Sequence, residues 1–305
     1  MLDFLRSEGI DEAMLSQIAD FRSSYPVGDA SRYRIPAPKY KYYGREVWRK
    51  ALAALLAGEN LLLVGPKATG KNVLAENLAA VFQRPQWDVS FYLNTDAASL
   101  IGTDTFKNGE VSLRRGPIYQ CAVEGGFGVL DEINMAKNES LSVLHATLDF
   151  RRIIDVPGYD RIELAPCTRF IATMNYGYAG TREINEALAS RFMVINMPVI
   201  SAADLERLMT AQFPRLRQEY AHQLAEMFQE IRKKCDSSEI STKALDLRGL
   251  LAAVHLTEQG LTLGEALDMG IMSKSFDEFE RQLVSDTVAA RIDGNLGRTD
   301  IFEND

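Results

Sequence analysis

The chain has 305 residues, of which 46% are hydrophobic and 25% charged, and its 34 basic and 42 acidic residues leave a net charge of −8. This composition indicates a soluble globular protein with room for one large and one smaller domain. The acidic balance argues against a general polyanion-binding surface, so we do not expect nucleic acid as a partner. No apolar run approaches the roughly 20 residues that span a bilayer, and the acidic start does not look like a signal peptide. We therefore expect no membrane association and a cytoplasmic location.

Cysteines and histidines are few and isolated. Cys121, Cys167 and Cys235 are far apart and form no C-x-x-C pair, so we predict neither disulfides nor a thiolate metal site. The three histidines are equally scattered, which favours helix-face or core positions over metal ligation.

Residues 1–40 are predicted to form an N-terminal helix and a linker. Apolar residues recur at helical spacing from Ile10 to Phe21, ahead of Tyr25-Pro26. Prolines then punctuate residues 26–38, which indicates an extended linker. A second amphipathic helix follows and ends at Gly58. Tyr43, at its entry, is a candidate wall for a nucleotide base, although a simple helix-entry turn explains it equally well.

The stretch LLLVGPKATGKNVLAENLAA, residues 61–80, predicts a nucleotide phosphate site. Its apolar start indicates a buried parallel strand, and the next residues match G-x-x-x-x-G-K, in which backbone N–H groups and a helix N-terminus face a polyphosphate. Lys71 would bridge the β- and γ-phosphates. The alternative is a chance glycine loop. The predicted nucleotide-binding set is Gly65, Pro66, Lys67, Ala68, Thr69, Gly70, Lys71, Asn72 and Val73, together with Tyr43.

Two residues depart from the usual pattern of this loop. Asn72 stands where Ser or Thr would place a hydroxyl on Mg²⁺. Its side-chain carbonyl oxygen can still bind a hard cation, although the Asn side chain is longer than that of Ser or Thr. We therefore keep Asn72 as a predicted metal ligand. Ala68 replaces a common glycine, which narrows the backbone freedom of the loop.

The strand predicted over residues 127–130 ends in Asp131-Glu132. Before it we expect a strand over 87–93, a short helix through Leu100, a β-hairpin turning at Asn108-Gly109 and a helix over 116–124. Ligands of open α/β sheets bind at the carboxyl ends of the strands. Asp131 would therefore hold Mg²⁺, and Glu132 would polarise the attacking water. A cap for the following segment is the alternative for Asp131.

A helix over 138–148, a hairpin around Pro157-Gly158 and a strand over 168–174 come next. That strand ends in Asn175, whose amide could orient the water or contact the γ-phosphate, or could simply form a turn. A helix over 183–190, then Arg191 and a strand over 192–196, complete the α/β pattern.

Strands cease beyond Ser201, where helical patterns cover 202–213, 216–234, 245–259 and 263–292. The switch predicts a domain boundary near Pro198, which separates an α/β nucleotide-binding domain over 41–198 from a helical domain over 199–305. Arg248 lies among leucines in the third of these helices, and a solvent-facing arginine is the alternative to a functional one.

The order of motifs resembles that of AAA+ ATPases of the MoxR type, close to the CbbQ, NorQ and GvpN ATPases. The motifs are GPKATGKN, FKNGEVSL, GVLDEIN, RRIIDVPGYDRIEL, ATMN, ASRF and DLR, and the resemblance covers about Tyr42 to Gly264. It implies a P-loop αβα sandwich with a parallel central sheet and hairpin insertions, followed by an all-α lid. It further implies that ATP/ADP and Mg²⁺ are the cofactors and that the reaction is ATP hydrolysis.

The same resemblance implies residue roles. Asn175 matches the first sensor position, Arg248 the sensor arginine of the lid, and Arg191 the arginine finger that reaches the nucleotide of a neighbouring subunit. A homo-oligomeric ring, a hexamer in this family, is therefore implied. The partner would be a separate chain with a von Willebrand A domain, and a protein client would be remodelled, activated or assembled.

Two other functions stay open at this point. A nucleotide-gated scaffold with weak hydrolysis would explain Asn72. A DNA-directed motor is the less favoured reading, for which Lys107, Arg114 and Arg115 could form a basic ring.

Overall fold

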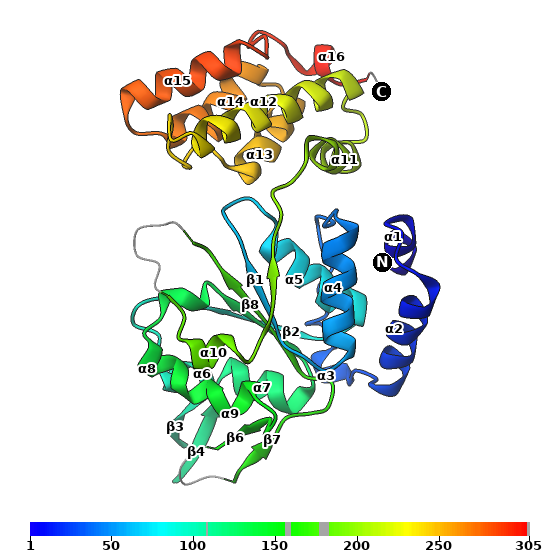
Figure 1. Ribbon diagram of the computed structural model, residues 1–305, viewed down its shortest axis with the longest axis vertical. Helices are drawn as coiled ribbons and strands as arrows, with labels where there is room; N and C mark the ends of the chain where they lie inside the picture. The colour runs from blue at the N-terminus through cyan, green and yellow to red at the C-terminus, as the bar shows by residue number, and fades with distance from the viewer. Residues whose placement is uncertain (108, 156–159, 177–182, 304–305) are drawn as a thin grey trace. The chain divides into compact units, whose positions relative to one another are not determined.

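The computed structural model describes residues 1–107, 109–155, 160–176 and 183–303 (Figure 1). Its internal contacts divide the chain into two compact units. The first comprises Met1–Pro66 and Gly70–Pro198, and the second comprises Lys67–Thr69 and Val199–Asp305.

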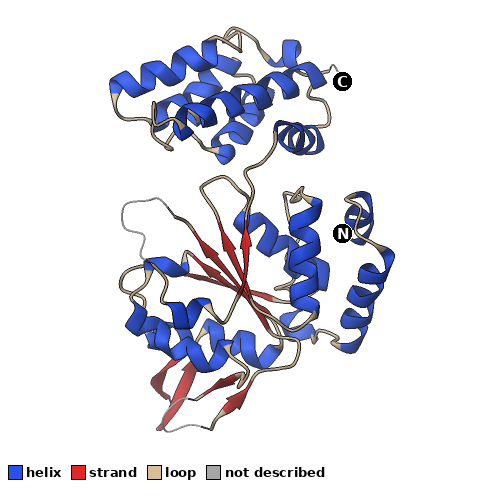
Figure 2. Ribbon diagram, viewed as in Figure 1, coloured by secondary structure: helices blue, strands red, loops and turns tan. Residues whose placement is uncertain are grey.

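The first unit is built around a five-stranded sheet with the order β2-β5-β8-β1-β9, in which every neighbouring pair is parallel (Figure 2). The strands are β1 (Leu61–Val64), β2 (Gln86–Ser90), β5 (Phe127–Asp131), β8 (Arg169–Met174) and β9 (Met193–Asn196). Each of these strands lies where the hydrophobic pattern predicts one. The α/β fold with a parallel central sheet is therefore confirmed.

Helices cover both faces of this sheet, and β1 shows why its sequence is apolar throughout. Leu61 and Leu63 enter the core that contains α4 (Arg45–Leu56) and α5 (Lys71–Phe82). Leu62 and Val64 enter the opposite core, which contains α7 (Pro117–Glu124). Successive side chains of a strand point to opposite faces, so a strand buried on both sides needs an unbroken apolar run.

The N-terminal segment differs from the prediction of one helix and an extended linker. The structure has α1 (Leu2–Ser7), α2 (Glu12–Ser24) and the short α3 (Asp29–Arg32). Asp11 caps α2 by accepting a bond from the Met14 N–H. Leu5 and Ile18 are fully buried in the same core as Trp48 of α4. The packing of these short helices, rather than their own periodicity, stabilises them.

Two antiparallel hairpins project from the α/β unit, as predicted. The first joins β3 (Gly102–Lys107) to β4 (Glu110–Arg115), directly after α6 (Ala97–Ile101). The second joins β6 (Ile153–Ile154) to β7 (Ile162–Glu163). The predicted turn residues Asn108 and Pro157-Gly158 lie outside the described residues.

Two helices of the first unit differ from prediction in extent. The helix expected over 138–148 is broken into α8 (Asn138–Leu141), a 3-10 turn (Ser142–Leu144) and α9 (His145–Leu148). The Ser142 hydroxyl donates to the Glu139 carbonyl at 2.7 Å, a local bond that competes with regular helix. The helix expected over 183–190 is only α10 (Glu186–Ala189), because Asn185 caps it by accepting from the Leu188 N–H.

The second unit is all-α in its described residues 199–303, apart from one β-bridge between Leu216 and Phe302. Its helices are α11 (Ala202–Gln212), α12 (Gln218–Asp236), α13 (Leu247–Glu258), α14 (Leu263–Gly270), α15 (Glu278–Ala289) and α16 (Arg298–Ile301). A Cβ atom on Gly249 would lie 1.9 Å from the Gly270 carbonyl oxygen, so α13 and α14 meet backbone to backbone. Within the described ranges, every helix is too short or too polar to cross a bilayer.

Candidate nucleotide site

The loop between β1 and α5 has the backbone that a phosphate site needs. The Gly65 N–H donates to the Met174 carbonyl at 3.2 Å, which extends the β1–β8 pairing into the loop. Ala68 and Gly70 adopt left-handed φ values of 61° and 76°. Glycine does so freely and alanine at a cost of about 1 kcal/mol, so Ala68 does not prevent the turn.

Lys71 is the first residue of α5, and its side chain turns back into the loop. Its ammonium donates to the carbonyls of Gly65 and Pro66, both at 2.8 Å, and the residue is only 7% exposed. Burial lowers the pKa of Lys71 to about 8, while the carboxylates of Asp131 and Glu132 act in the opposite direction. A poorly hydrated cation is thus held beside two carboxylates, where incoming phosphate oxygens would stabilise its charge.

Asp131 and Glu132 are joined to β8 by one hydroxyl group. Thr173 Oγ1 donates to Asp131 Oδ1 at 2.6 Å and accepts a bond from the Glu132 N–H at 3.0 Å. Glu132 has a φ of 55°, in the left-handed region. This backbone turns the chain sharply after β5 and leaves the Glu132 side chain exposed.

Asn175 completes this group of side chains. Its amide nitrogen donates to Glu132 Oε1 at 2.9 Å, and the buried Asn134 amide donates to the Asn175 carbonyl at 2.8 Å. The structure therefore brings together Lys71, Asp131, Glu132 and Asn175 at the carboxyl edge of the sheet. Thr173 and Asn134 are additions to which the sequence analysis gave no role, and their only signal was their place within the motifs ATMN and GVLDEIN.

The donors at this edge fit Mg²⁺. Asp131 is half-buried at the end of β5, and Asn72 is exposed at the second position of α5. In the described part of the chain, no group of three or more His, Cys, Asp or Glu side chains could hold a metal ion. Mg²⁺ usually binds through one or two carboxylates plus substrate phosphates, so a sparse, all-oxygen donor set suits it.

Arg191 follows α10 and contacts residues of its own unit. Its guanidinium donates to the carbonyls of His145 (3.1 Å) and Ala187, and lies 3.4 Å from Asp149 Oδ2. Asp149 also binds Arg151, and that bond is the main reason why the pKa of Asp149 is lowered. The Arg191 side chain is 20% exposed, and its role toward a neighbouring subunit stays a prediction.

Tyr42, rather than Tyr43, lies against the phosphate loop. A Cβ atom on Gly70 would sit 3.1 Å from the ring of Tyr42, which is buried and accepts a bond from Trp48 Nε1 through its carbonyl. Asn77 of α5 binds the Tyr42 N–H and ties this segment to the helix. The Tyr43 ring packs edge-on to Phe4 at 5.5 Å, and its role at a nucleotide base stays a prediction.

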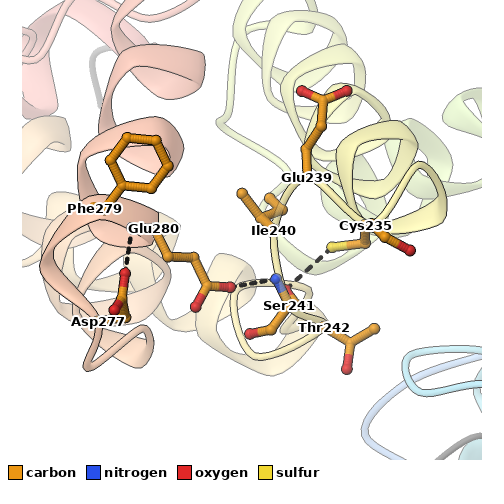
Figure 3. A pocket seen from close by; sticks show the side chains of 9 residues that line it. Cys235, Glu239, Ile240, Ser241, Thr242, Asp277, Phe279 and Glu280 are labelled. Atoms are coloured by element: carbon orange, nitrogen blue, oxygen red, sulfur yellow. Dashed lines mark hydrogen bonds between the residues drawn. The ribbon is translucent and has the colours of Figure 1, made fainter.

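In the second unit, Arg248 is exposed in the first turn of α13. Its predicted contact with nucleotide remains a prediction. This unit also has a hollow, shown in Figure 3, whose polar groups bind neighbouring backbone. Glu280 accepts from the Ser241 N–H, and the Cys235 thiol donates to the Ser241 carbonyl at 3.3 Å. The predicted site residues do not line this hollow.

Comparisons with known proteins agree with the sheet and the loop. Residues 60–192 match the family model of the AAA domain of the dynein-related subfamily. The uncharacterized protein YojN of Bacillus subtilis is 29% identical over 282 residues, covering 91% of each chain. The uncharacterized protein SAB1265c of Staphylococcus aureus is 33% identical over 255 residues, covering 82% of this chain and 97% of its own. A solved chain from Cytophaga hutchinsonii covers 91% of this chain and 97% of its own at 14% identity, with a TM-score of 0.45, too distant for structural detail.

Proposed function

This chain belongs to the AAA+ ATPases of the MoxR type, and from that membership we propose that it hydrolyses ATP to ADP and phosphate to remodel, activate or assemble a protein client. The observation that supports hydrolysis is the joining of Lys71, Asp131, Glu132 and Asn175 at one edge of the sheet. Binding of nucleotide alone would not require the exposed carboxylate of Glu132.

Residues 65–73 bind the phosphates in this proposal. The N–H groups at the start of α5 point to the anion, and the Lys71 ammonium exchanges the carbonyls of Gly65 and Pro66 for phosphate oxygens. Asp131, with the Asn72 carbonyl as an additional ligand, would hold Mg²⁺, which supplies charge neutralisation on the phosphates when bound.

Glu132 acts on the attacking water. Its Oε1 accepts the Asn175 amide at 2.9 Å, which leaves Oε2 to accept a hydrogen bond from water. Asn175 orients the carboxylate and the γ-phosphate in the same step. Because Glu132 is exposed, a water can reach it before any movement of the backbone.

Ring formation would bring Arg191 to a neighbour's nucleotide. Its present partners are carbonyls and Asp149, and a phosphate group would offer the guanidinium acceptor oxygens of the same kind. We propose a hexameric ring in the cytoplasm, with Arg248 acting from the helical lid over 199–305. The partner would be a separate von Willebrand A domain protein. The hairpins would contact the client, and the cross-strand pair Phe106 and Val111 on the first hairpin is 76% and 63% exposed.

Steady-state ATPase assays of the wild type beside Glu132→Gln, with the mass of the protein measured in parallel, test this proposal. We expect the wild type to turn over ATP with Mg²⁺ and to gain activity as rings form. Glu132→Gln should bind ATP with similar affinity and hydrolyse it about 10² to 10⁴ times more slowly, the usual contribution of a general base. Equal turnover in the two proteins would refute the role of Glu132.

Asn72 favours a second function, a nucleotide-gated scaffold with weak hydrolysis. Its amide is exposed at the position where a hydroxyl usually meets the metal. Asn72→Thr separates the two functions. If turnover appears only in Asn72→Thr, the natural chain is a scaffold, whereas comparable turnover in both proteins supports an active motor.

A further inference from the structure

We propose that Thr173 is a positioning residue that fixes Asp131 and Glu132 for metal-dependent catalysis. This inference depends on the proposed ATPase function and gives a role to a residue of the ATMN motif that the sequence analysis left without one. Its hydroxyl bonds to Asp131 Oδ1 and to the Glu132 N–H, so its effect would pass through the two carboxylate residues.

Thr173 lies in β8, between the strand that ends in Asp131 and the strand that leads into the phosphate loop. β8 is flanked by β5 on one side and β1 on the other, and Thr173 is paired directly with Leu63 of β1. On the β5 side, Leu130 pairs with Ala172, so Asp131 lies next to Thr173. One side chain of the central strand therefore lies between the acidic strand end and the strand that enters the phosphate loop.

The hydroxyl of Thr173 has only one possible hydrogen-bond arrangement. The Glu132 N–H can only donate, so Oγ1 must accept from it over 3.0 Å. Its single proton is then available to Asp131 Oδ1, 2.6 Å away. Thr173 is 1% exposed, so water does not compete readily for either bond. These two bonds therefore leave Oδ1 of Asp131 bound to the Thr173 hydroxyl.

Two consequences follow for the site. With Oδ1 bound to Thr173, Oδ2 is the oxygen of Asp131 that would hold a magnesium ion or its water. The same hydroxyl also stabilises the left-handed backbone of Glu132, which determines where that carboxylate projects. Loss of the hydroxyl should therefore reduce both the gain in nucleotide affinity on adding Mg²⁺ and the rate of ATP turnover.

The test compares Thr173→Val, which keeps the shape and removes the hydroxyl, with Thr173→Ser, which keeps the hydroxyl. Thr168→Val is a matched control, because Thr168 precedes the same strand, is fully buried and donates to the Ala122 carbonyl at 3.1 Å. For each protein, the affinity for a fluorescent ATP analogue is measured with Mg²⁺ and with EDTA, and turnover is measured separately.

We expect the wild type, Thr173→Ser and Thr168→Val to share the same gain in affinity on adding Mg²⁺. For Thr173→Val the gain in affinity should be about tenfold smaller, the size expected for one hydrogen bond to a charged group. The affinity of this variant in EDTA should differ little from that of the wild type. An unchanged gain in Thr173→Val, or an equal loss in Thr168→Val, would overturn the positioning role.

The same data separate this inference from the proposed function. If the wild type binds the analogue with a magnesium-dependent gain but does not hydrolyse ATP, the hydrolytic function fails while the affinity ratios still decide the role of Thr173. If the wild type binds no analogue, both fail.

Discussion

The two edges of the central sheet use charge in opposite ways. At the amino edge, buried arginines donate to backbone carbonyls: Arg169 binds those of Leu55, Pro166 and Thr168 at 2.9, 2.7 and 2.8 Å. Arg84 likewise binds the Gly125 carbonyl at 2.7 Å. At the carboxyl edge, the Lys71 ammonium and the carboxylates of Asp131 and Glu132 interact with one another and form the candidate nucleotide site.

Contacts that stabilise the fold and groups of the candidate site thus lie at opposite ends of the strands. A guanidinium bound to main-chain carbonyls satisfies acceptors that would otherwise be buried without partners, so it stabilises the fold. The buried ammonium of Lys71 loses hydration that its protein partners do not fully replace, and this burial is the main cause of its lowered pKa. We expect loss of the Arg169 charge and loss of the Lys71 charge to change stability with opposite signs.

The largest effect is expected at the amino edge. Arg169→Met should lower the free energy of unfolding by about 3 to 5 kcal/mol, because three carbonyls lose their donor. Denaturant unfolding monitored by circular dichroism measures it. Arg161→Met is the control, since that side chain is 60% exposed and its loss should change stability by less than about 0.5 kcal/mol. Equal stability of Arg169→Met and wild type would contradict the stabilising role of this edge.

The next effect is expected at the carboxyl edge and has the opposite sign. The pKa of Lys71 is about 8 in the folded chain and 10.5 for an ordinary lysine. Between these values the unfolded chain binds more protons than the folded chain, so wild-type stability rises with pH there. Below pH 8 the buried charge destabilises the fold. Lys71→Met should therefore raise the free energy of unfolding at pH 7 by about 1 to 3 kcal/mol while abolishing nucleotide binding.

Unfolding curves at pH 7, 9 and 10 check this prediction, since the advantage of Lys71→Met should shrink as the pH rises. Lys50→Met, at an exposed position of α4, should show no such trend. A variant at Lys71 that is less stable than wild type at pH 7 would mean that the ammonium supports the loop rather than straining it.

The smallest change in stability is expected at Asn175. Its bond to Glu132 is at the exposed end of the network, so Asn175→Ala should lower the free energy of unfolding by less than about 1 kcal/mol. Turnover should nevertheless fall by about tenfold or more, since the carboxylate loses its orienting donor. Thermal melting and ATPase assays on one preparation separate the two effects, and a loss of activity that merely follows a loss of folded protein would refute the orienting role.

The sequence predicted what depends on local pattern. The loop over 65–71, the acidic end of β5 and both hairpins follow from glycine spacing, apolar runs and turn residues, so they were found without tertiary information. The strand order also agrees with the α/β interpretation. Short-range signals were sufficient because each of these elements carries its own periodicity or turn chemistry.

What escaped prediction depends on contacts between distant segments. α1 has too few residues to show a period, and Leu5 is helical because it packs near Trp48. Thr173 is indistinguishable from any strand threonine until β5 is placed beside it. Arg169 begins an apolar run, where an arginine suggests the surface, yet its carbonyl partners make burial possible.

The strand order also determines which strand pairings can form while the chain is being synthesised. β1 leads into the phosphate loop early in the sequence, but its partners β8 and β9 are made much later, with Leu61 pairing with Ile171 and Met193. Non-local pairings of this kind form slowly. The ribosome must therefore release most of the first unit before β1 has neighbours on both sides. A nascent chain would bring Lys71, Asp131 and Asn175 together only after β8 has emerged.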